Sequence, residues 1–357
     1  MADGRNEPVC VGEDMLRQLC VALLEALGVA PGDALTTADV FLQAELMGEE
    51  SHGLRLFLLV LERVKAGGDR AVTKIDVEMD RGAVALWNAN RSLGQVTAAR
   101  AMALAMDKAR DHGIGFVAVH NANSLTSAKY YPLRAAEAGM IGLVFSNTSR
   151  KLMPPPGGTT PVLGNNPVAM AAPAGDYGAF VLDMACTAAA VERIVNAGER
   201  GEPIPSGWAL DRDGKETNDP ALALESLALL PFGGHKAFGL AMVHEILTSV
   251  LGGGPLQAGN SKGFEPFDGA MNTAFSLMAI DISAFMAVAA FERRMDALIE
   301  SIKSAERQDP DVPILYPGER SLGEMTRRKR EGIPVAAATL DKLHGWARDL
   351  GVAAIAE

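Results

Sequence analysis

The stretch "EESHGLR", which runs from Glu49 to Arg55, places a side chain suited to acid–base chemistry beside one suited to anion binding. His52 carries an imidazole, a group whose unperturbed pKa of about 6.5 lets it donate or accept a proton near neutral pH. Three residues later, Arg55 offers a planar guanidinium that can bind a carboxylate through paired hydrogen bonds. The structural alternative is a polar helix start in which Arg55 is a surface residue paired with Glu49 or Glu50.

The other histidines of the chain have more ordinary settings. His112 precedes Gly113 at an expected helix end, where a cation is a common structural feature. His244 and His344 fall inside expected helices, and we interpret them as surface or packing residues. These interpretations leave His52 among the candidates for acid–base work.

Composition narrows the class of protein. The 357 residues suggest about two domains, and the net charge of −11 argues against a general nucleic-acid binder. The basic run from Arg327 to Arg330 is interpreted as solvated surface. Three widely spaced cysteines, Cys10, Cys20 and Cys186, fit neither a disulfide framework nor a zinc site, which favours a reducing cytoplasm. No signal peptide or apolar run of about 20 residues is seen, so no membrane partner is expected.

Helical periodicity is clearest at the N-terminus. Apolar residues between Leu16 and Leu27 recur at three- and four-residue steps, which predicts a helix that Gly28 ends. A second helix is expected from Asp33 to Met47, with Asp33 as its N-cap. A third follows the opening stretch and ends at the glycine pair 67–68. We therefore expect residues 1–75 to form a helical N-terminal segment.

Beyond residue 75, short β-type runs alternate with helical stretches, which predicts an α/β domain with a mostly buried sheet over residues 76–300. Residues 301–357 are expected to pack with the N-terminal segment as a second lobe. "LDRDGKET" contains an Asp-Gly turn and predicts a hairpin. The strand candidates are 83–88, 115–120, 141–147, 167–172, 179–185 and 274–281, and the later helix candidates are 95–112, 126–138, 236–251 and 284–306.

The common nucleotide-binding and hydrolase motifs are missing. "GIGFVAV" lacks the third glycine of a dinucleotide fingerprint, and no phosphate-binding G-x-x-x-x-G-K-[ST] occurs. "VHEIL" fails as a zinc motif because Thr248 stands where the second histidine is needed, so no metal is expected. No G-x-S-x-G elbow is present.

Six blocks of the chain share a family pattern: "SHG" at Ser51–Gly53, "LGQV" at Leu93–Val96, "PPGGTTPVLGNNPVAMAAP" at Pro155–Pro173, "VLDMACTAAAVERI" at Val181–Ile194, "LLPFGGHKAFGLAMVHEIL" at Leu229–Leu247 and "YPGER" at Tyr316–Arg320. They follow one another in the expected order over nearly the whole chain, which makes the set specific. Together they resemble the malate/L-lactate dehydrogenase family of the second type, whose members also include sulfolactate, ureidoglycolate and diketogulonate enzymes and a reductase of cyclic ketimine carboxylates.

The resemblance implies a fold and a reaction. It implies a non-Rossmann α/β domain that binds NAD or NADP, a helical lobe built from the two ends of the chain, and a homodimer. It also implies hydride transfer at the carbon next to a carboxylate, for which the protein must orient the substrate and move one proton. No residue decides between NAD and NADP.

The resemblance also implies roles for particular residues. His52 matches the family's acid–base position, and Ser51 beside it is expected to contact substrate. Asp183 ends a strand-like run, from which its carboxylate could reach the imidazole and fix its tautomer. The alternative for Asp183 is an N-cap for a helix starting at "MACTAAAVERI", and both roles could hold.

Three departures from the family pattern concern the substrate. Many relatives have the arginine four residues after the histidine, where this chain has Leu56 and places Arg55 one position earlier. Many have a histidine after Asn-x-Asn, where this chain has Ser124. Lys129 could compensate as a proton donor, together with Tyr130. Asn165 stands where threonine is common, so an amide would face the substrate in place of a hydroxyl.

The cofactor blocks follow the family more closely. The glycines before His235 and Lys236 permit close backbone approach, and the lysine is suited to a phosphate. The alternative is a loop and N-cap for the next helix. "DMACTA" offers a hydroxyl and backbone N–H groups at an expected helix start, a natural seat for an anion. The remaining candidates for cofactor contact are Met184, Cys186, Thr187, Gly318, Glu319 and Arg320.

Three hypotheses follow. The first is an NAD(P)-dependent oxidoreductase acting on a small 2-oxo or 2-hydroxy carboxylate, with His52 handling the proton and Arg55 anchoring the acid. The second is a reductase of cyclic or N-substituted imino acids, which is favoured because the block "LLPFGGHK" resembles the ketimine-reductase branch of the family. The third is a non-catalytic nicotinamide-binding protein, which the changes at Ser124 and Asn165 favour and the retained His52, Asp183 and Lys236 oppose.

Overall fold

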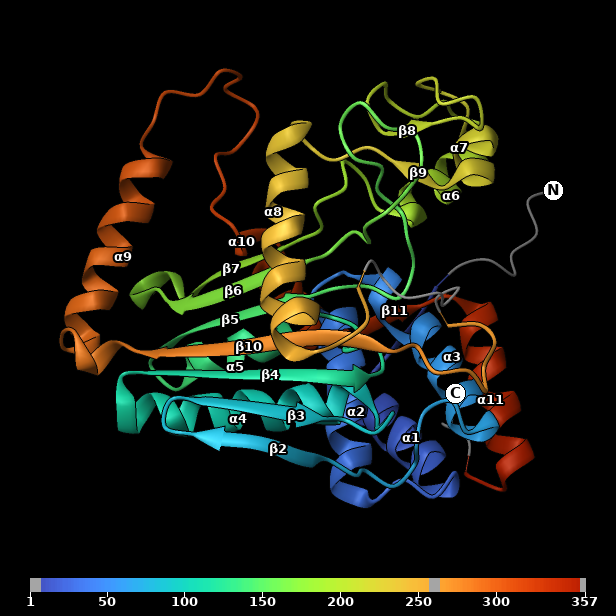
Figure 1. The fold of residues 1–357 in the computed structure, drawn as a ribbon, viewed down its shortest axis with the longest axis horizontal. Coiled ribbons are helices and arrows are strands. Elements are labelled where there is room, and N and C mark those ends of the chain that lie inside the picture. The colour runs from blue at the N-terminus through green and yellow to red at the C-terminus, as the bar shows by residue number, and fades with distance from the viewer. Residues whose placement is uncertain (1–7, 257–263, 354–357) are drawn as a thin grey trace.

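The computed structural model describes residues 8–256 and 264–353, and it has a helical lobe and a sheet domain (Figure 1). The helices are α1 (Glu13–Ala26), α2 (Pro31–Leu46), α3 (Leu54–Ala66), α4 (Gly94–His112), α5 (Tyr130–Glu137), α6 (Val191–Glu199), α7 (Pro220–Ser226), α8 (His235–Glu245), α9 (Val288–Lys303), α10 (Glu319–Glu331) and α11 (Ala337–Leu350). Short helical turns are η1 (Glu50–His52), η2 (Gly175–Tyr177), η3 (Ile246–Val250) and η4 (Ile282–Ala284).

The strands form one large sheet and two small ones. They are β1 (Val9–Val11), β2 (Asp76–Arg81), β3 (Val84–Asn88), β4 (Ile114–Ala122), β5 (Met140–Ser146), β6 (Val168–Pro173), β7 (Ala179–Met184), β8 (Ala209–Leu210), β9 (Ala228–Leu229), β10 (Thr273–Asp281) and β11 (Ile333–Val335). The large sheet has the order β2-β3-β4-β10-β5-β6-β7. Only β3 and β4 pair in parallel, whereas a doubly wound dinucleotide fold is mostly parallel.

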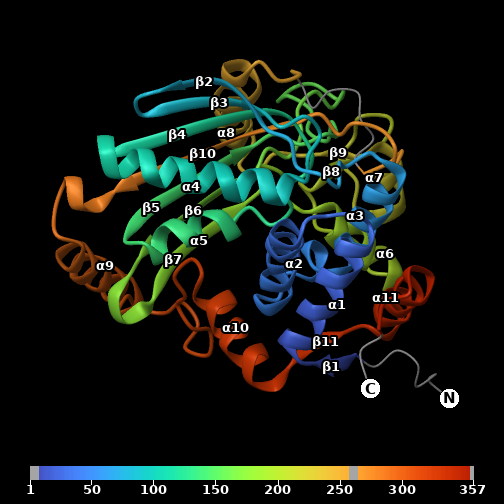
Figure 2. The same cartoon turned by 90° about the horizontal axis from the view of Figure 1, so that it is seen from below.

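Helices cover both faces of the large sheet, which confirms the predicted α/β class. α4 and α5 lie on one face and α8 crosses the other (Figure 1, Figure 2). The predicted strands 115–120, 141–147 and 274–281 lie within or closely match β4, β5 and β10. Their apolar side chains are buried because the sheet is covered on both sides. The segments α6, α7, β8 and β9 form a small separate cluster beside the sheet.

The two ends of the chain pack together in the helical lobe, as predicted. β1 pairs with β11 in antiparallel fashion, and one buried apolar cluster joins α1, α2 and α3 to α11. Leu16, Leu23 and Leu343 are fully buried in this cluster. The domain boundaries near residues 75 and 300 stay predictions.

The start of α2 differs from the prediction. The helix begins at Pro31, whose fixed φ suits the first helical position, so Asp33 lies inside the first turn and is not the N-cap. Its carboxylate instead forms an ion pair with Arg100 at 2.6 Å. By contrast, α3 ends as predicted, with Gly67 in the left-handed conformation at φ 83°.

A buried arginine ties α3 to the segment that leads into β10. Arg63 is 1% exposed, and its Nε donates to Asp69 at 2.7 Å. The same guanidinium donates to the carbonyl oxygens of Phe264 at 2.9 Å and Gly269 at 2.8 Å. Arg63 therefore supplies hydrogen-bond donors to backbone carbonyl oxygens of the irregular segment 264–269.

In the part of the chain that the structure describes, no helix has both the length and the apolar content that crossing a bilayer requires.

Candidate active site

Several strand ends meet at one end of the large sheet and bring together segments far apart in sequence. β4, β5 and β7 end there, and β6 and β10 begin there. The segments that leave this edge carry Lys129, Asn165 and Asp183, all candidates from the sequence. The register pairs that define the edge are Ala122 with Thr273, Ser146 with Phe275 and Val168 with Met184.

The Ser51–His52–Gly53 turn is supported by a side chain of α2. Glu45, which is 5% exposed, accepts the N–H of Leu54 at 2.7 Å through Oε1 and so caps the start of α3 from a distance. A Cβ added to Gly53 would lie 2.1 Å from that same Oε1. The glycine of the turn is therefore required by the Glu45 side chain that orients it.

We expect Gly53→Ala to destabilise the protein by about 2–4 kcal/mol, because the added methyl displaces a buried, hydrogen-bonded carboxylate. Turnover should fall with it, since the same shift moves His52. Chemical denaturation checks the stability. Gly323→Ala is the matched control, because a Cβ there meets no atom within 4 Å. Equal stability of the two variants would show that Glu45 does not constrain the turn.

Arg328 corrects the interpretation of the basic run as solvated surface. It is 7% exposed and donates through Nη1 to the carbonyl oxygen of Glu45 at 2.9 Å. It also pairs with Glu50 at 3.4 Å and with Glu324 at 2.6 Å. Burial raises the pKa of Glu45 to about 7, while the Leu54 N–H and Arg328 favour its charged form. The C-terminal helix α10 thus supports the turn that carries His52.

Lys129 connects the His52 turn to the sheet. Its ammonium forms an ion pair with Glu49, two residues before Ser51. Its backbone N–H donates to Asp183 Oδ2 at 3.1 Å. Glu49 also accepts from Ser127 Oγ at 3.2 Å. The burial of Lys129, which the sequence did not reveal, makes it a member of this polar group.

Arg55 projects from the first turn of α3 and is exposed. The alternative in which it pairs with Glu49 or Glu50 is wrong, since those carboxylates pair with Lys129 and Arg328. Among the described residues, Arg55 makes no hydrogen bond or ion pair. Its guanidinium is therefore free to bind an anion.

Asp183 lies in β7, and α6 begins only at Val191, so the N-cap alternative for this carboxylate is wrong. Burial and the nearby Glu49 raise the pKa of Asp183 to about 7, while Lys129 and its amide favour the ionised form. His52 Nδ1 lies 2.9 Å from Ser51 Oγ. Within residues 8–256 and 264–353, His52 and Asp183 share no hydrogen bond, so their pairing stays a prediction.

Ser124, at the position of the missing histidine, is used in the local turn. Its Oγ accepts the N–H of Thr126 at 3.1 Å. Thr126 has φ 62°, in the left-handed region that β-branched residues rarely adopt. Ser124 therefore makes local contacts in this loop where many relatives have a histidine. The charged side chain that the loop contributes to the polar group is Lys129.

Three buried oxygens near Asn165 lack hydrogen-bond partners in the described parts of the chain. They are Asn165 Oδ1, Asn166 Oδ1 and Thr148 Oγ1. A Cβ on Gly164 would lie 1.9 Å from Thr148 Oγ1 and 2.9 Å from Asn166 Oδ1, so two of these oxygens border the same backbone. Buried polar atoms are normally paired, which makes them candidates for ligand contact. The sequence indicated Asn165 but not Thr148 or Asn166.

The two cofactor blocks around residues 186 and 235 lie side by side. Cys186 N–H donates to Asn165 O at 2.7 Å, Phe232 N–H donates to Cys186 O at 3.1 Å, and Thr187 bridges to Pro231. Met184 ends β7 immediately before this segment. Thr187 donates to Ala189 O at 2.9 Å and lies before α6, so the predicted helix start at this hydroxyl is wrong.

Cys186 contributes packing and backbone groups here. Its thiol donates to Asn166 O at 3.3 Å and lies 3.7 Å from His244 Nδ1. Burial raises the pKa of Cys186 to about 11, which keeps the sulfur protonated. His244 is 3% exposed and bonds Asn166 O at 2.7 Å, so its interpretation as a packing residue is confirmed.

The N-terminus of α8 has the features of an anion site. Gly233 and Gly234 both adopt positive φ, at 58° and 63°, and α8 begins at His235. His235 and Lys236 are exposed, and neither is engaged by another described side chain. Free N–H groups and a cation at a helix start favour a phosphate.

The "PGER" block packs against the edge strand β7. Pro317 O accepts the N–H of Val181 at 3.0 Å, and a Cβ on Gly318 would lie 2.9 Å from Val181. Glu319 starts α10 and pairs with Lys303. Arg320 is exposed. The block lies along the strand that carries Asp183, but contact of its side chains with a cofactor stays a prediction.

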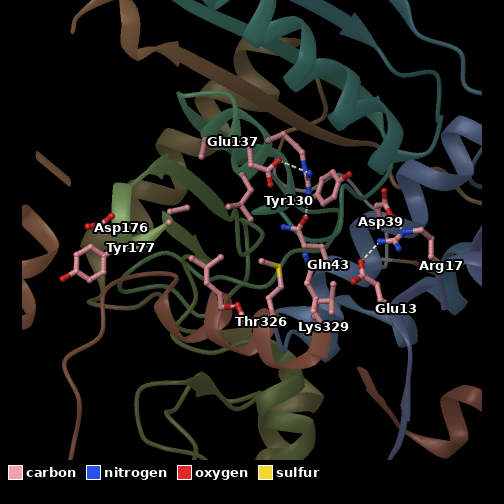
Figure 3. A pocket seen from close by; sticks show the side chains of 18 residues that line it. Glu13, Arg17, Asp39, Gln43, Tyr130, Glu137, Asp176, Tyr177, Thr326 and Lys329 are labelled. Carbon is pink, nitrogen blue, oxygen red and sulfur yellow. Dashed lines mark hydrogen bonds and ion pairs between the residues drawn. The ribbon is translucent and has the colours of Figure 1, made fainter. Parts of the chain in front are cut away.

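A cavity of about 670 Å³ lies elsewhere, between α1, α2, α5 and α10 (Figure 3). It includes Tyr130, whose ring faces the guanidinium of Arg134 at 4.8 Å, so Tyr130 points away from the Lys129 group. Its charges are largely paired internally, as in Arg17 with Asp39 at 2.8 Å. Apart from Tyr130, none of the residues predicted for the site lines it.

Known proteins match this chain over almost its whole length. The profile of the malate/L-lactate dehydrogenase family covers residues 11–344. The malate/(S)-sulfolactate dehydrogenase of Methanothermus fervidus is 36% identical over 340 residues, 94% of this chain and 96% of that protein. The solved sulfolactate dehydrogenase of Methanocaldococcus jannaschii is 35% identical, with a TM-score of 0.90 over 96% of this chain and 98% of that one.

The solved structure of a reductase is also similar. The delta1-piperideine-2-carboxylate reductase of Pseudomonas syringae is 28% identical, with a TM-score of 0.85 over 95% of this chain and 100% of that one. The resemblance inferred from the sequence blocks is thus confirmed. The chain belongs to the malate/L-lactate dehydrogenase family.

Proposed function

We propose that this protein transfers a hydride between NAD(P) and C2 of a small 2-oxo or 2-hydroxy acid that carries a second anionic group, as malate and sulfolactate do. The observation that carries the proposal is the convergence of the His52 turn, Lys129 and Asp183 at one sheet end. It occurs in a chain 36% identical to a malate/(S)-sulfolactate dehydrogenase. The guanidinium of Arg55, which no described residue engages, supports an anionic substrate.

The residues present fit a nicotinamide dinucleotide. The α8 start with Lys236 suits its phosphates, and the unpaired oxygens of Asn165 and Asn166 suit its amide and hydroxyl donors. The bound cofactor supplies the hydride. His52 then donates a proton to the oxygen at C2, and Arg55 holds the C1 carboxylate. Asp183 orients the imidazole and favours its protonated form.

A substrate panel tests the proposal. The purified protein is mixed with NADH or NADPH and with oxaloacetate, 3-sulfopyruvate or pyruvate, and loss of the reduced-cofactor absorbance is followed. We expect turnover of the first two acids to exceed that of pyruvate, because pyruvate lacks the second anionic group. Nicotinamide binding without turnover of any acid would favour a non-catalytic role.

Reduction of a cyclic imino acid is the second candidate. The structural similarity to a piperideine-carboxylate reductase and the serine in place of a second histidine both favour it. Adding a cyclic ketimine carboxylate to the same panel separates the two. Turnover of the imine alone would reject the keto-acid substrate.

We also propose a homodimer in the cytoplasm. α8 and η3 expose an apolar stripe, with Leu240, Val243 and Val250 exposed at 45%, 46% and 57%. The free thiols fit a reducing compartment. Light scattering should give twice the chain mass of 37.6 kDa. Val243→Glu should lower it, and an unchanged dimer would place the interface elsewhere.

A further inference from the structure

Lys129 is the one residue that contacts both segments assigned to proton transfer, as far as the described residues show. It directly precedes α5, 77 positions after His52 (129 − 52). Its side chain reaches Glu49, which belongs to the segment leading into the His52 turn. Its backbone N–H reaches Asp183 on β7. Lys129 is thus one of the residues through which the helical lobe and the sheet domain meet.

The ion pair is partly buried. The Lys129 side chain is 6% exposed and that of Glu49 is 29% exposed. Burying an ammonium is costly unless a carboxylate and further hydrogen bonds compensate. Ser127, which is 3% exposed, supplies one of these bonds by donating to the second oxygen of Glu49 at 3.2 Å. The pair therefore has a fixed geometry.

We propose that Glu49 and Lys129 are positioning residues for proton transfer: their ion pair joins the His52 turn to Asp183 and sets the charge of that carboxylate during turnover. This inference rests on the proposed roles of His52 and Asp183. The pair takes over the electrostatic work in a chain that has Ser124 in place of a second histidine.

Lys129 and Glu49 shift the pKa of Asp183 in opposite directions. Lys129 favours the ionised carboxylate and Glu49 favours the protonated one, with a pKa of about 7 as the result. Among the described residues these are the charged groups that act on it, from the segments before α5 and before η1. On the neighbouring strand β6, its register partner is the uncharged Ala169.

This charge matters for the reaction. Reduction adds the hydride to C2 and the proton of His52 to the oxygen, which leaves a neutral imidazole that regains a proton from solvent. An ionised Asp183 stabilises the imidazolium that must form again. The fall of kcat/KM for reduction at low pH, the acidic limb of its pH profile, therefore reports the protonation of Asp183. The ion pair determines the pH at which this fall occurs.

The test is the pH profile of kcat/KM for Glu49→Gln, Lys129→Met and the double variant. Lys129→Met should move the acidic limb to higher pH by about one unit, because the favourable cation is lost. Glu49→Gln should move it to lower pH, and the double variant should lie between the two. Lys129→Arg should keep the wild-type limb. Glu137→Gln, an exposed carboxylate paired with Arg134 on α5, is the control whose limb should not move.

Limbs that stay at the wild-type position, or that move in the same direction in both single variants, would overturn the inference. If Lys129→Met fails to fold by circular dichroism, Glu49→Gln decides alone, because its amide can still accept from Ser127. Near-normal turnover of His52→Ala would contradict the proposed function itself. Loss of turnover in His52→Ala together with unmoved limbs would contradict only the role of the ion pair.

Discussion

Replacing His52 by alanine should lower kcat for 2-oxo acid reduction by about 10²- to 10⁴-fold, because the variant lacks the general acid. Binding of the reduced cofactor should be preserved, because the α8 start around Lys236 is a separate part of the site. The turn itself should keep its conformation in this variant, because Glu45 accepts the N–H of Leu54 and packs against Gly53. Steady-state rates and cofactor fluorescence titration check the two halves of this expectation.

His112→Ala is the matched control. This histidine is exposed at the C-terminal end of α4, away from the strand ends that form the site, and its loss should leave kcat unchanged. Near-wild-type kcat in His52→Ala would remove the imidazole from the mechanism and would leave Lys129 as the next residue to test.

Arg63→Met should destabilise the protein by about 3–5 kcal/mol, the range seen when one partner of a buried ion pair is removed. Methionine keeps the length of the side chain but leaves the Asp69 carboxylate without its cation. It also leaves the carbonyl oxygens of Phe264 and Gly269 without their donor. Urea denaturation measures the loss, and Arg70→Met, an exposed neighbour, is the control.

The loss should depend on pH. Burial raises the pKa of Asp69 to about 6, while Arg63 favours its charged form. Without Arg63 the folded-state pKa rises further above the unfolded value. The folded variant then binds its proton more tightly than the unfolded chain does, and stability is regained as pH falls through that pKa. The double variant Arg63→Met/Asp69→Asn should recover part of the loss at pH 8. Equal stability of the single and double variants would show that the buried charge is not the cause.

The helices and the sheet core could be predicted because their signals are local. The three- and four-residue steps from Leu16 to Leu27 and the apolar run of β10 each report burial of a short segment. β2 escaped prediction because it is exposed throughout and shows no apolar alternation. Asp33 has the residue type of an N-cap, but Pro31 prefers the first helical position and starts the helix two residues earlier.

The supports of the site could not be predicted, because they join residues far apart in sequence. Arg328 reaches Glu45 across 283 positions, and nothing in the run Arg327–Arg330 distinguishes the buried member from its exposed neighbours. Lys129 and Glu49 are likewise distant, and each alone reads as an ordinary charged residue. The His52 turn, Asp183 and the α8 start could be predicted as parts of the site because they lie in sequence blocks that resemble the family.

Isotope transfer tests the central claim most directly. Wild-type protein is given oxaloacetate or 3-sulfopyruvate with reduced cofactor deuterated at C4 of the nicotinamide, and the product is examined by NMR. A single deuterium at C2 of the hydroxy acid, formed far more slowly by His52→Ala, is the predicted result. Product without deuterium at C2, or formed equally fast by the variant, would contradict hydride transfer to a 2-oxo acid with His52 as the proton donor.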